Sequence, residues 1–110
     1  LYLQKSLAGN IDIFNGNIVL EPDGTIKAKK LALEENQTIG SGTISAGQTE
    51  VIISTTAISN NSKVFITATS DTNNQALFIA EKTEGDSFKV AISTPNGSDI
   101  SFDWFIADAE

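Results

Sequence analysis

The carboxylates Glu81, Asp99 and Asp103 are the first side chains in this sequence that could do chemistry. Glycoside hydrolysis needs two such acids on either side of a scissile bond. Each of the three lies in a polar turn or on the polar side of an alternating segment, where acidic side chains are ordinarily exposed to solvent. We therefore interpret them as solvated acids, and we expect no catalytic residues and no enzymatic activity.

Two segments rich in Asp and Asn could bind calcium, which takes oxygen ligands. They are Asp71-Thr72-Asn73-Asn74 and Asn96-Gly97-Ser98-Asp99. Neither matches the spacing of an EF-hand loop, and Asp and Asn favour such turns because their side chains bond to the nearby backbone. The chain has no His and no Cys, so imidazole and thiolate sites are excluded. We expect turns here, with no metal and no cofactor.

The single Trp could stack on a sugar ring if it were exposed. However, Trp104 shares one face of an alternating strand with Phe102 and Ile106, and the other face carries Asp103, Phe105 and Ala107. Packing in a core or a subunit contact is the better interpretation. Phe65, Phe78 and Phe105 lie on faces otherwise made of Thr, Ala and Asp, which predicts a second apolar surface for contact between subunits.

The net charge of the chain restricts the classes of partner that it could bind. Fourteen acids against seven cations, all of them Lys, give a net charge of −7, which opposes binding to nucleic acid or to an anionic membrane surface. The basic cluster of Lys27, Lys29 and Lys30 is interpreted as a solvated face that pairs with Glu34 and Glu35. No run approaches the roughly 20 apolar residues of a membrane span, so we expect no membrane insertion.

The elements that position these residues are short β-strands. Turn residues such as Gly40-Ser41-Gly42, Glu84-Gly85-Asp86 and Pro95-Asn96-Gly97 divide the chain at intervals typical of an all-β protein. Between them, apolar and polar residues alternate with period two. The pattern predicts antiparallel strands, joined by short turns, that close into a sandwich or small jelly roll. The predicted strands after residue 40 are 41–45, 49–55, 63–70, 76–81, 87–93 and 100–107.

Residues 1–40 have a different pattern and are predicted to form a stem, with residues 41–110 forming a tip domain. The first part contains apolar pairs between polar turns, among them Ile18 with Leu20 and Ile26 with Ala28. Ribbons this thin cannot bury an apolar side alone. Charge is also uneven, because residues 1–40 carry four Lys and five acids whereas residues 41–110 carry three Lys and nine acids.

Residues 15–33, with the sequence NGNIVLEPDGTIKAKKLAL, resemble the stem repeats of trimeric phage tail fibres and bacterial surface fibres. Several later segments resemble the β-rich tip domain that often follows such stems. They are Gly42–Ile44, Ala46–Val51, Asn61–Thr67, Gln75–Phe78 and Phe102–Ile106.

This resemblance implies a parallel homotrimer on a stalk, at or near the C-terminus of a longer extracellular or virion protein. The first residue is Leu rather than Met, and we expect a fragment or a processed chain. The favoured function is a structural tip that trimerises a fibre, with assembly or core roles expected for Ile18, Leu20, Ile26, Phe65, Phe78, Phe102 and Trp104. The alternative is a module that binds a carbohydrate or receptor through its aromatic residues and Asn-rich loops.

Overall fold

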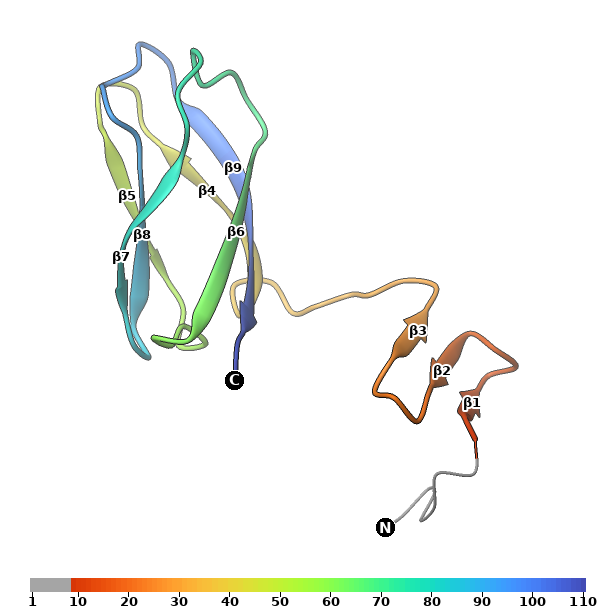
Figure 1. Cartoon of the computed structure of the whole chain (residues 1–110). Coiled ribbons are helices and arrows are strands. Elements are labelled where there is room, and N and C mark those ends of the chain that lie inside the picture. The colour runs from red at the N-terminus through yellow and green to blue at the C-terminus, as the bar shows by residue number, and fades with distance from the viewer. Residues whose placement is uncertain (1–8) are drawn as a thin grey trace. The chain divides into compact units, whose positions relative to one another are not determined.

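The computed structural model describes residues 9–110, and every regular element in this part of the chain is a β-strand. Nine strands form three antiparallel sheets of three strands each (Figure 1). The predicted all-β class is therefore confirmed. Because the described residues contain no helix, they contain none long and apolar enough to cross a membrane.

The chain divides into two compact units, residues 1–32 and residues 33–110. The sequence predicts a later boundary, between residues 40 and 41. The segment before β4 belongs to the second unit because its backbone is bonded there. Thr55 Oγ1 donates a hydrogen bond to Gln37 O at 2.6 Å, and Ile106 N donates one to Thr38 O at 2.7 Å.

The first unit is a small meander of three strands, β1 (Ile11–Ile13), β2 (Ile18–Leu20) and β3 (Ile26–Ala28). Its two turns have local causes. Asn15 and Gly16 both adopt positive φ, 55° and 87°, in the first turn. In the second turn Gly24, at φ 93°, donates from its N–H to Glu21 O at 3.0 Å.

The register of this meander gathers apolar side chains on one face. The first row across the three strands consists of Ile11, Leu20 and Ile26. The next row on the same face consists of Ile13, Ile18 and Ala28. The opposite face carries the row Asp12, Val19 and Lys27.

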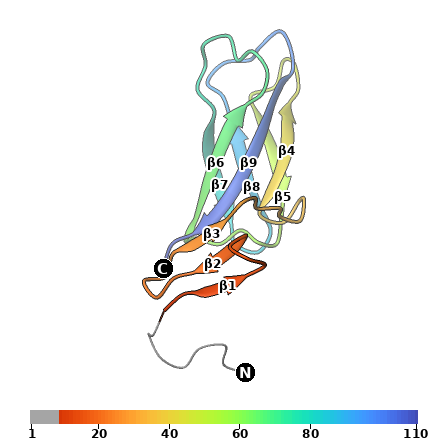
Figure 2. The same cartoon turned by 90° about the vertical axis from the view of Figure 1, so that its right-hand side faces the viewer.

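The second unit contains six strands, and each corresponds to one of the six predicted segments. They are β4 (Ile39–Ile44), β5 (Glu50–Ser54), β6 (Ser62–Ala68), β7 (Phe78–Thr83), β8 (Ser87–Ala91) and β9 (Ile100–Asp108). One sheet has the order β4-β9-β6 and the other the order β5-β8-β7 (Figures 1 and 2).

The connections in this unit differ from the expected series of short turns. Only β7 and β8 are consecutive strands that pair with each other, across the turn at Gly85. Every other connection passes from one sheet to the other, so strands that are neighbours in sequence are not neighbours in a sheet.

The two sheets face each other across one hydrophobic core. Phe102, Trp104 and Ile106 project into it from alternate positions of β9, and Phe88 and Val90 project from β8. The rings of Phe88 and Trp104 meet edge to face, with centroids 5.2 Å apart and planes at 76°.

The segment Gly40-Ser41-Gly42 was predicted to be a turn that leads into the strand 41–45, and the turn was wrong. It forms the middle of β4, where Gly40 pairs with Trp104 and Gly42 with Phe102. The two glycines face the core, and their missing side chains leave the space that the two aromatic rings occupy.

Candidate functional site

The three carboxylates that could have formed a catalytic pair lie on different parts of the second unit. Asp103 is on β9, where it accepts a hydrogen bond from Ser41 Oγ at 2.8 Å. Glu81 is on β7 of the other sheet, and Asp99 precedes β9 in a loop. The structure therefore does not bring these acids together at one site.

The two Asx-rich segments, although distant in sequence, lie at the same end of the second unit. We call this the loop end, formed by the loops 45–49, 69–77 and 92–99 (Figure 1). Hydrogen bonds join the three loops. Gly47 N donates to Asn96 O at 2.8 Å, and Gln75 Oε1 accepts from Thr94 N at 2.9 Å.

The carboxylates at the loop end hold the backbone of these loops. Asp71 Oδ1 accepts a hydrogen bond from Asn73 N at 2.8 Å, which closes an Asx turn. Asp99 Oδ1 accepts one from Ala46 N at 2.8 Å and so connects two loops. Within residues 9–110, no three carboxylates gather in a group suited to a metal ion.

One exposed part of the loop end is amide-rich. Asn73 and Asn74 both adopt positive φ, 56° and 62°, and both are exposed to solvent. Asn tolerates this conformation better than most residues. The loop end therefore presents exposed amide side chains on loops that are connected by hydrogen bonds.

Trp104 is buried, with only 2% of its surface exposed, and is therefore unavailable for stacking on a sugar ring. Phe102 is fully buried beside it. The indole Nε1 of Trp104 has no hydrogen-bond partner among the described residues. A buried donor left unpaired is uncommon.

The exposed aromatic residues do not form the single second surface that was expected. Phe65 and Phe105 lie together on the outward face of β4-β9-β6, with ring centroids 6.1 Å apart. Ile39 pairs with Phe105 on the other side, which completes an apolar row across three strands. Phe78 belongs to β7 of the other sheet, because that strand pairs with β8 rather than with β6 or β9.

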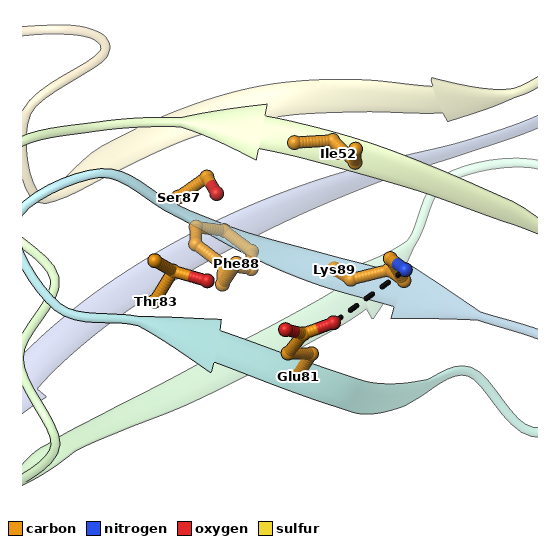
Figure 3. A pocket seen from close by; sticks show the side chains of 6 residues that line it. All are labelled: Ile52, Glu81, Thr83, Ser87, Phe88 and Lys89. Atoms are coloured by element: carbon orange, nitrogen blue, oxygen red, sulfur yellow. Dashed lines mark ion pairs between the residues drawn. The ribbon is translucent and has the colours of Figure 1, made fainter.

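The outward face of β5-β8-β7 carries an ion-pair group that sequence analysis missed. Lys89 Nζ lies 3.6 Å from both Glu50 Oε1 and Glu81 Oε2. A bulge between Ile79 and Glu81 sets the register that places Glu81 opposite Lys89. A shallow hollow of about 150 Å³ lies beside this group, lined by Ile52 and Ser87 among others (Figure 3).

In the meander, Lys27 pairs with Glu21 at 2.5 Å, and not with Glu34 or Glu35 as predicted. The β2–β3 hairpin brings Glu21 back beside Lys27, whereas Glu34 and Glu35 lie beyond the end of β3.

In the turn between β2 and β3, hydrogen bonds from the Thr25 side chain and backbone N–H hold the pKa of Asp23 below its ordinary value.

Comparisons with protein-family models, with curated proteins and with solved structures found no match to this chain. The resemblance to fibre stems and tips consequently remains a prediction based on the residues quoted for it.

Proposed function

We propose that this chain is a non-enzymatic structural domain that trimerises an extracellular or virion fibre-like protein, as a short β-stem followed by a sandwich tip. The observation that carries the proposal is the apolar face of the meander. The six side chains of the two apolar rows belong to strands of only three residues each. One of these side chains, that of Ile26, is 71% exposed.

This face favours assembly because so small a sheet cannot stabilise itself in water. Each buried aliphatic side chain contributes about 1.5–3 kcal/mol relative to an exposed one, so leaving several uncovered gives up a large share of the stability of a small protein. Copies of the same meander around one axis would cover these faces together and protect the short strand edges. The number three comes from the resemblance of residues 15–33 to trimeric stems.

Sedimentation equilibrium of the 110-residue chain at micromolar concentration tests this function. We expect a mass of three times the 11.7 kDa of one chain. A monomer or a dimer that persists across the concentration range would contradict the proposal.

A second candidate function is the binding of a glycan or receptor, and the loop end is the observation that favours it. Its exposed amides on hydrogen-bonded loops resemble an adaptable polar binding surface. The exposed aromatic residues Phe65 and Phe105 lie on a sheet face and not in these loops. A ligand would therefore be held at the loop end by amides without help from those rings.

Glycan-array binding by the wild-type chain and by an Asn73→Ala/Asn74→Ala variant tests this second function. We expect binding to disappear in the variant while its melting temperature stays within a few degrees. Absence of binding by the wild type, or equal binding by both chains, would count against the loop end as a ligand site.

A further inference from the structure

The sheet β4-β9-β6 has a shallow hollow at each of its two edges. Beside β6, a hollow of about 330 Å³ is lined by the apolar side chains of Val64, Phe65 and Ile79 and by two cations, Lys63 and Lys82. We call this the β6 hollow. One carboxylate, that of Asp108, lies beside it and accepts a hydrogen bond from Ser62 Oγ at 2.6 Å. The β6 hollow therefore carries an excess of positive charge.

The hollow at the opposite edge has the same size and the opposite charge. Beside β4, about 330 Å³ is lined by the apolar residues Leu33 and Ile39 and by two carboxylates, Glu35 and Asp103. We call this the β4 hollow. Neither carboxylate forms an ion pair with any residue of the range 9–110. In a chain with few cations, an apolar hollow with two unneutralised acids is suited to a basic partner surface.

The two hollows share one row of the sheet. Ile39 of the β4 hollow and Phe65 of the β6 hollow are the two ends of the row that Phe105 joins at its centre. Figure 2 shows β4, β9 and β6 side by side in this sheet.

The β6 edge also has backbone groups directed to its open side, whereas beside β4 the Ile39 O already accepts a hydrogen bond from Asn36 N at 2.7 Å. The residues that flank β6 bond toward β9, since Asn61 O accepts from Ala109 N and Thr69 N donates to Ser101 O. In β6 the alternate residues, such as Val64 and Ile66, therefore direct their N–H and C=O groups to the open side. An uncovered edge of this kind is a template for another chain.

We infer that the two hollows are the two halves of one contact, in which the β6 hollow of one copy of this chain meets the β4 hollow of the next copy. The lysines of one copy would face the carboxylates of its neighbour, and the apolar rows would continue from copy to copy. This inference rests on the proposed trimer and names the surfaces through which residues 33–110 take part in it.

The charges favour a head-to-tail contact over a two-fold one. A two-fold contact between β6 edges would bring Lys63 and Lys82 against their own copies, and like charges in contact are unfavourable. A head-to-tail contact between two different surfaces forms a ring if the rotation closes. Because both hollows include the row of Ile39, Phe105 and Phe65, successive copies can meet along that row, as closure requires.

Charge exchange in the whole chain tests this inference by sedimentation equilibrium. We expect Glu35→Lys and Lys63→Glu each to lower the trimer association constant at least tenfold, because each places like charges in the contact. The double variant Glu35→Lys/Lys63→Glu should recover most of the wild-type value. Glu84→Lys is the matched control, since it makes the same change in net charge at an exposed turn outside both hollows. It should leave association unchanged or strengthen it.

A second pair of variants tests the apolar part of the contact. Phe65 and Ile52 are exposed to similar extents, 58% and 61%, on the outward faces of the two different sheets. We expect Phe65→Asp to reduce the association constant at least tenfold and Ile52→Asp to leave it within threefold of wild type. Circular dichroism melts of both variants verify that each chain remains folded.

The outcomes separate this inference from the proposed function. If the wild type is a trimer and neither Glu35→Lys, Lys63→Glu nor Phe65→Asp weakens it, the two-hollow contact is wrong while the trimer stands. Loss of assembly in both single charge variants without recovery in the double variant would also overturn the pairing of Glu35 with Lys63. A wild-type monomer would overturn both proposals.

Discussion

Gly40 lies directly opposite Trp104 in the pairing of β4 with β9, and a Cβ atom added to Gly40 would come within 2.6 Å of the indole Cζ2. A strand glycine usually weakens a sheet because it packs nothing. Here the neighbouring ring covers the glycine, an arrangement known to compensate for glycines at sheet edges. Gly42 repeats it with Phe102, whose Cζ would lie 2.5 Å from an added Cβ.

Gly40→Ala is therefore expected to destabilise the second unit, because the indole has to move or the strand has to shift. Overpacking of this kind costs about 1–3 kcal/mol of unfolding free energy, which urea denaturation would measure. Gly97→Ala is the control, since an added Cβ meets nothing within 4 Å there and the backbone φ is not in the strained positive range. Its effect should stay within about 0.5 kcal/mol, and equal effects of the two changes would contradict the close packing of Gly40 against Trp104.

Trp104→Ala should leave a large void between the two sheets, because the indole packs against Phe88 and is almost completely buried. The expected loss is about 3–5 kcal/mol of unfolding free energy. Trp104→Phe should lose less, since it keeps an aromatic ring and removes an N–H that bonds to none of the described residues. In the wild type, the Trp fluorescence should be blue-shifted and poorly quenched by iodide. A red-shifted, easily quenched spectrum would mean that the ring is exposed.

Ile18→Asp should weaken the proposed trimer much more than Val19→Asp. The two residues are adjacent in β2 and both are half-buried, but Ile18 is on the apolar face whereas Val19 lies between Asp12 and Lys27 on the other. A charge buried in the assembled apolar face would cost several kcal/mol in each chain. The trimer fraction at matched concentrations, determined by sedimentation, checks this. Similar losses in both variants would show that the apolar face is not the assembling one.

Chelation should leave the structure and its assembly intact. At the loop end, Asp71 and Asp99 already use carboxylate oxygens to accept backbone N–H groups from Asn73 and Ala46. We expect the melting temperature in EDTA to match that in calcium within a degree or two. A fall of more than a few degrees in EDTA that calcium reverses would show that these loops hold an ion.

The sequence by itself determined the elements whose signals are local. Alternation over Phe102, Trp104 and Ile106 predicted both the last strand and its inward face, because successive strand side chains point to opposite sides whatever the strand pairs with. The turn at Asn15-Gly16 was equally readable, since its positive φ values suit these residue types.

Only the tertiary structure decided which strands pair and what the glycines of β4 do. Glycines often mark turns, and Gly40 and Gly42 belong to a strand because rings from β9, about sixty residues later in the chain, fill their space. Likewise, Phe65 and Phe78 have similar surroundings in sequence but lie on different sheets. The physical reason is that strand pairing maximises burial between segments far apart along the chain, and the alternation within each strand is the same for every partner it could have.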